Sequence, residues 1–218
     1  MTMGTVTPTE PPAGPPVIPR SAAGPLSPEH LAELAQADQR ARKVRKAGGV
    51  AMFNGCTVAF FAGGCLLFAA ISPLFGELDV EALVMAAGLG VVAWNEFRGR
   101  RLIRRFDPRA CRLLAWNQLG LMALVIGYCA WQIAGAVFGP HPYADAMAKE
   151  PMLAPTLGPI GDLYKTLTIA LYGAVIAGTI VFQGLNAAYY FTRRKHVLAY
   201  LDETPRWVVE IQRCSSGA

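Results

Sequence analysis

The chain alternates long apolar stretches with short charged ones. Four stretches contain no charged residue: 47–76, 82–95, 113–144 and 166–192. A membrane-spanning helix requires about 20 predominantly apolar residues, and the first, third and fourth stretches satisfy this requirement. The second stretch is shorter, so its length alone leaves open a span, a re-entrant segment or a buried segment.

The distribution of basic residues favours a span for the second stretch. Five Lys or Arg residues lie within 40–46, directly before the first stretch, seven lie between the second and third, and five follow the fourth. The other two connections contain Lys149 and Lys165. If the second stretch did not cross, seven arginines would share a side with the acidic turn at Glu77, Asp79 and Glu81. Cytoplasmic loops are enriched in Lys and Arg, so we expect four spans with both termini cytoplasmic, in a plasma or inner membrane.

The predicted fold is therefore an all-α integral membrane protein, a four-transmembrane-helix bundle with a short amphipathic helix on the cytoplasmic side at each end. The spans of the membrane domain, residues 47–192, are expected at about 47–72, 78–97, 112–138 and 164–192. The two hairpins share short similarities, and a tandem duplication remains open.

Proline and capping residues predict the flanking segments. Residues 1–26 are rich in proline and are expected to form a disordered cytoplasmic tail. A hydroxyl N-cap followed by proline at Ser27-Pro28 begins a basic juxtamembrane helix, 27–46, which either lies on the inner membrane surface or is solvated. Thr204-Pro205 repeats this device and predicts an interfacial helix within the tail 193–218. Five prolines predict an irregular outer loop over 139–163.

Composition agrees with a membrane environment and points to no reaction. The chain is 53% hydrophobic and 16% charged, with a mean hydropathy of +0.33. The five cysteines form no disulfide framework, and their spacing matches no metal site. The three histidines lie outside the spans, where they cannot ligate a haem within the bundle. No catalytic motif is present, so we expect no enzyme activity, no cofactor and no bound metal.

Amide side chains are the first candidate site. Four asparagines and two glutamines are expected at similar depth, one or two turns from the cytoplasmic end of each span. They are Asn54, Asn95, Asn117, Gln118, Gln183 and Asn186. This polar layer could line a pore mouth or a headgroup pocket, or it could fix helix register by interhelical hydrogen bonds worth about 0.6 kcal/mol each. Glu96 is expected only at the inner border of its span, so proton-coupled transport is disfavoured.

Arginines between the second and third spans are the second candidate site. They are Arg98, Arg100, Arg101, Arg104, Arg105, Arg109 and Arg112. Guanidinium groups match the geometry of phosphate, so this cluster could bind anionic headgroups or an acidic partner. It could also serve as a topological anchor and nothing more. A nucleic-acid partner is not expected, because the cluster is tied to the membrane plane.

These observations predict a non-enzymatic, multi-pass membrane protein that acts by association, as an accessory or scaffold subunit. Small residues at helical spacing, such as Gly55, Ala59 and Gly63, favour helix association in lipid. The expected partners are anionic lipid headgroups and either a second copy of the chain or a larger membrane complex. The alternative is a small homo-oligomeric channel with an amide-lined cytoplasmic mouth.

Overall fold

A computed structural model describes residues 26–76, 78–140 and 143–215, so all but the last residue of the predicted tail over 1–26 lies outside the described residues. The regular structure in the described part is helical. In chain order the elements are α1 (Pro28–Ile71), η1 (Ser72–Phe75), α2 (Val80–Arg104), α3 (Arg109–Phe138), α4 (Ala144–Lys149), η2 (Pro151–Leu153), α5 (Ala154–Glu203) and α6 (Arg206–Ser215). Helices α1, α2, α3 and α5 are long and apolar enough to cross a membrane, which confirms four candidate spans.

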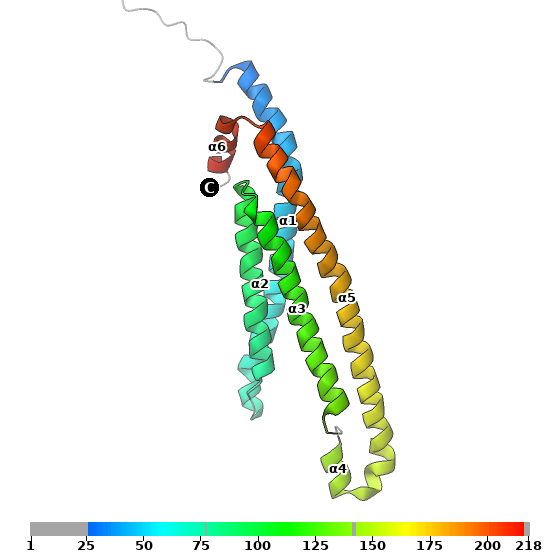
Figure 1. The fold of residues 1–218 in the computed structure, drawn as a ribbon. Coiled ribbons are helices and arrows are strands. Elements are labelled where there is room, and N and C mark those ends of the chain that lie inside the picture. Colours follow the sequence, from blue (N-terminus) through cyan, green and yellow to red (C-terminus); the bar gives the residue numbers. More distant parts are fainter. Residues whose placement is uncertain (1–25, 77, 141–142, 216–218) are drawn as a thin grey trace, which may run out of the picture.

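The four long helices form two antiparallel hairpins (Figure 1). Helix α1 packs against α2, α3 packs against α5, and α2 contacts α3 along the junction between the hairpins. The α3–α5 hairpin extends beyond η1 and ends at α4. The start of α1, the turn between α2 and α3, the end of α5 and helix α6 lie together, and we call this the basic end (Figure 1).

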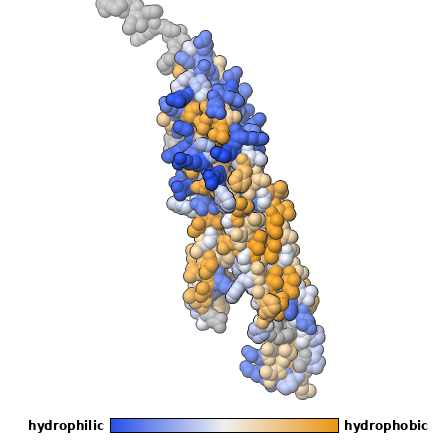
Figure 2. Space-filling model, viewed as in Figure 1, coloured by the Kyte–Doolittle hydropathy of each residue, from blue (hydrophilic) through white to orange (hydrophobic). Residues whose placement is uncertain are grey.

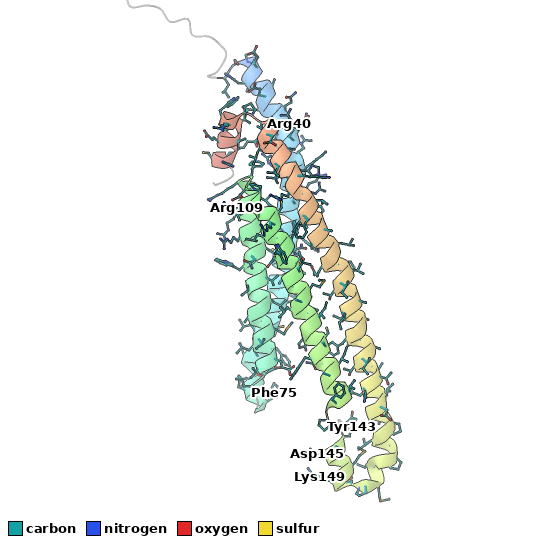
Figure 3. The ribbon with its side chains drawn as sticks, viewed as in Figure 1. Arg40, Phe75, Arg109, Tyr143, Asp145 and Lys149 are labelled. Carbon is teal, nitrogen blue, oxygen red and sulfur yellow. The ribbon has the colours of Figure 1, made fainter. Side chains whose placement is uncertain are left out.

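Polar and apolar surfaces are separated along the bundle. Hydrophilic residues gather at the basic end, whereas hydrophobic residues cover most of the two hairpins beyond it (Figure 2). Arg40 and Arg109 lie at the basic end, and Phe75 lies at the opposite end of its hairpin (Figure 3). Asp145 and Lys149 mark α4 at the far end of the longer hairpin (Figure 3).

Helix α1 differs from the expectation of a separate juxtamembrane helix before the first span. It begins as predicted, where the Ser27 hydroxyl accepts a hydrogen bond from the His30 backbone N–H at 3.3 Å. It then continues without a break through residue 46 into the apolar stretch. The reason is a stripe of small buried residues that runs in phase across the predicted boundary: Ala37, Ala41, Val44, Ala47 and Ala51. The predicted amphipathic helix is thus the first part of α1.

Helix α6 is present where Thr204-Pro205 predicted it, but it packs on protein. Its Val208 is completely buried, Val209 is nearly so, and both belong to the core cluster of the basic end. The Trp207 ring meets the His30 ring edge-on, with centroids 5.2 Å apart. The apolar side of α6 is therefore covered largely by the core cluster of the basic end, although Ile211 is exposed.

The predicted irregular loop over 139–163 is largely helical. It contains α4, η2 and the start of α5. Pro155 lies in the first turn of α5, where a backbone N–H has no intrahelical partner, so proline is tolerated there. Pro159 lies inside α5 and costs the helix one backbone hydrogen bond.

Candidate functional site

A carboxyl group lies buried between α2 and α3. Glu96 in α2 is 0% exposed, and it faces Asn117 (7%) and Gln118 (1%) in α3. Asn117 Nδ2 donates to Glu96 Oε1 at 2.8 Å, and Gln118 Nε2 donates to the same oxygen at 2.7 Å. Asn117 Nδ2 also donates to the Val92 carbonyl at 3.0 Å. We call these three side chains (Glu96, Asn117 and Gln118) the carboxyl–amide cluster.

A second polar contact joins the hairpins beside this cluster. Asn54 Nδ2 in α1 donates to the Tyr190 hydroxyl in α5 at 3.4 Å, and the Tyr190 hydroxyl also lies near the Glu96 carboxyl. Gly55 allows α1 to approach closely, because a Cβ at that position would lie 3.1 Å from Glu96 Cβ. Side chains from all four long helices therefore meet at this depth.

The polar layer contains only three of the six predicted residues. These three are Asn54, Asn117 and Gln118. Asn95 and Asn186 are half-buried, and in the described residues neither side chain has a recorded hydrogen-bond partner. Gln183 is half-buried, with its Oε1 buried and without a donor. Helix α2 contributes Glu96 in place of Asn95, and α5 contributes Tyr190 in place of Asn186.

Sequence reasoning missed Glu96 because it judged depth along the helix and not direction around it. Successive helical residues point about 100° apart, so Asn95 and Glu96 cannot face the same neighbour. The buried residues of α2 are Ala86, Leu89, Val92, Ala93, Glu96, Gly99 and Ile103. Glu96 continues this stripe at three- and four-residue spacing, and that periodicity is the signal that could have identified it.

The seven predicted arginines all lie at or near the turn between α2 and α3. Six are exposed, and Arg100 is half-buried with its Nη1 2.7 Å from Met52 Sδ. Among the described residues, ion pairs are recorded for Arg40 with Glu203 and for Arg45 with Asp38, but for none of these seven. Their charge is therefore not neutralised by acids of the described chain.

A pocket of about 620 Å³ opens between α1 and α2 at the basic end. The residues that line it include Arg45, Arg100 and Arg104, together with Gly48 and Gly49. The glycines leave space that side chains would fill, and three guanidinium groups suit a phosphate or another compact anion. We call this the arginine pocket.

Comparison with protein-family models, curated proteins and solved structures finds no match for this chain. Within the described part of the chain, no three His, Cys, Asp or Glu residues come close enough to hold a metal ion.

Proposed function

We propose that this protein is a non-enzymatic integral membrane protein that acts by association, as an accessory or scaffold subunit. The observation that carries the proposal is the exposed arginine cluster at the basic end, which lacks ion-pair partners among the described residues. An exposed basic cluster of this density suits an anionic counterpart outside the described chain. Anionic headgroups and an acidic partner surface both supply one.

The orientation follows from the same charge. Under the positive-inside rule, the basic end lies in the cytoplasm, together with both termini. The packed core around α6 then stands at the inner membrane surface, where its arginines reach the headgroups. The exposed apolar side chains of the hairpins, such as Phe60, Leu67 and Phe182, face lipid or neighbouring helices in this arrangement.

A channel with an amide-lined mouth is less well supported. Asn117 and Gln118 are turned into the protein and bound to Glu96, so they do not line an open path in the single chain. A channel would need an oligomer in which other residues form the pore. Ion flux in liposomes containing the purified protein would favour that alternative.

Native mass determination after gentle solubilisation of the membrane tests the proposal. The expected result is a complex of defined stoichiometry, with a partner protein or further copies, that retains anionic lipid. A bare monomer with neither partner nor lipid would contradict it.

A further inference from the structure

Two buried oxygens in the carboxyl–amide cluster accept no hydrogen bond from the described residues. Glu96 Oε1 receives both amide donors, while Glu96 Oε2 has no partner. Gln118 donates through Nε2, while its Oε1 is buried without a partner. The acid and the amide are thus joined by one hydrogen bond, and each retains one bare acceptor oxygen. Buried acceptors of this kind are rare in folded proteins.

Among the described residues, no ion pair offsets the charge of Glu96. The side chains that face it are Asn117 and Gln118 from α3 and Tyr190 from α5, and α1 presents Gly55. On its own helix, Arg100 lies one turn away and is directed to Met52 Sδ. An ionised carboxylate buried without a cation costs several kcal/mol, so the packed structure requires a positive charge at this point.

Glu81, a second acid in α2, differs from Glu96 in how its carboxyl oxygens are hydrogen-bonded. Glu81 is exposed and receives a donor on each oxygen, from Trp131 Nε1 at 3.0 Å and from Gln132 Nε2 at 2.8 Å. Each oxygen of this carboxyl group therefore has its own donor. Glu96, with both donors on one oxygen and a bare second oxygen, has the arrangement that suits a protonated acid.

We propose that Glu96, together with Gln118 and Tyr190, forms a binding site for one proton within the predicted membrane-spanning part of the bundle. A proton on Glu96 Oε2 supplies the donor that the buried oxygens lack. It also lets the acid and the Gln118 amide pair through a second hydrogen bond. Loss of that proton leaves an uncompensated charge where the four long helices meet. Proton binding thereby favours the closed packing of the two hairpins.

The replacement Glu96→Gln tests this site, because the amide keeps the shape of the acid, carries no charge and places a donor beside the oxygens. Thermal unfolding of the purified protein in mild detergent is measured from mildly acidic to alkaline pH. We expect the wild type to lose on the order of 5–10 °C in Tm as pH rises, relative to Glu96→Gln. The matched control, Glu81→Gln, should retain the pH dependence of the wild type. Equal pH dependence in Glu96→Gln and the wild type would overturn the proposal.

Infrared spectroscopy tests the same site in the wild-type protein. In wild-type protein carrying isotope-labelled glutamate, a protonated carboxyl band that shifts with the label and is lost in Glu96→Gln reports the Glu96 acid. We expect such a band at neutral pH, and we expect it to be insensitive to sodium. Its absence would overturn the proposal. A band that disappears when sodium is added would assign the site to a metal cation and would also overturn it.

Discussion

Gly99 in α2 lies directly against Leu114 in α3. A Cβ built at Gly99 would come within 2.4 Å of Leu114 Cδ2 and 2.5 Å of Leu114 Cγ. Leu114 is completely buried in the core of the basic end, where any shift of its side chain disturbs packed neighbours. The absence of a side chain at Gly99 therefore sets how closely the two hairpins approach.

Gly99→Ala is expected to destabilise the protein by about 1–3 kcal/mol, because the added methyl group overpacks this contact. Thermal unfolding in mild detergent measures the loss. The matched control is Gly90→Ala in the same helix, where a Cβ would meet nothing within 4 Å. That variant should be neutral or stabilised by up to about 1 kcal/mol. Equal effects of the two substitutions would contradict close packing at Gly99.

A buried hydrogen bond links α6 to α5: the Tyr200 hydroxyl donates to Gln212 Oε1 at 2.7 Å. Tyr200→Phe keeps the ring, which stacks on Phe106 with centroids 4.4 Å apart, and removes only the donor. We expect a loss of about 1–3 kcal/mol, since Gln212 is left buried and unsatisfied. Limited trypsin digestion after Arg206 and Arg213 should accelerate. Tyr164→Phe, at an exposed tyrosine near the far end, should leave the digestion rate unchanged.

The sequence predicted the elements better than it predicted their packing. Four charge-free stretches correspond to four long helices, and Thr204-Pro205 correctly predicts the start of α6. Each of these signals is local, since it rests on a run of apolar residues or on a capping pair. The continuity of α1 was missed because its buried stripe consists mainly of alanines. Alanine contributes little hydrophobic contrast and reveals a packed face only when partners such as Ile103 are known.

The candidate site required the direction of each side chain, which residue type does not supply. Asn95 and Glu96 are neighbours in sequence, yet Glu96 lies in the protein interior and Asn95 does not. Tyr190 lies within the charge-free stretch 166–192, yet its hydroxyl accepts a hydrogen bond from Asn54 across the bundle. The arginine pocket likewise combines Arg45 with Arg100 and Arg104, from helices whose relative placement no sequence pattern defines.

Phe106 occupies a left-handed backbone conformation, with φ of 53°, in the turn between α2 and α3. It is almost completely buried, so Phe106→Ala should cost about 3–5 kcal/mol through lost packing. Phe106→Gly loses the same ring, but glycine adopts the left-handed backbone conformation without strain. The glycine variant should therefore be more stable than Phe106→Ala by about 1 kcal/mol. Ile103, buried inside α2, is the control, and its glycine variant should be less stable than its alanine variant. Thermal unfolding measures the stability of the four variants. If the alanine variant is the more stable one at both positions, the backbone at Phe106 is not strained.

The proposed orientation predicts which thiols react in intact cells. Cys214 is exposed on α6 at the basic end, and Ala148 is exposed on α4 at the far end. A membrane-impermeant thiol reagent should spare Cys214 and label Ala148→Cys, because only the far end faces outward under the proposal. Both should react after the membrane is permeabilised. Cys214→Ala identifies any signal from the remaining cysteines. Labelling of Cys214 in intact cells, with Ala148→Cys protected, would reverse the orientation.

The arginine pocket is expected to retain anionic phospholipid. Each basic residue near a headgroup contributes about 1 kcal/mol, so replacing Arg45, Arg100 and Arg104 with glutamine should weaken retention on the order of 100-fold. Native mass spectrometry counts the lipids that remain bound after exchange into zwitterionic lipid. The control replaces Arg42, Lys43 and Lys46, which are exposed on α1 outside the pocket, and it removes the same charge from the same end. Arg45→Gln combined with Arg104→Gln tests the pocket without disturbing the contact between Arg100 and Met52. If the control loses as much lipid as the pocket variants, the interaction is one of general surface charge and the pocket is not a binding site.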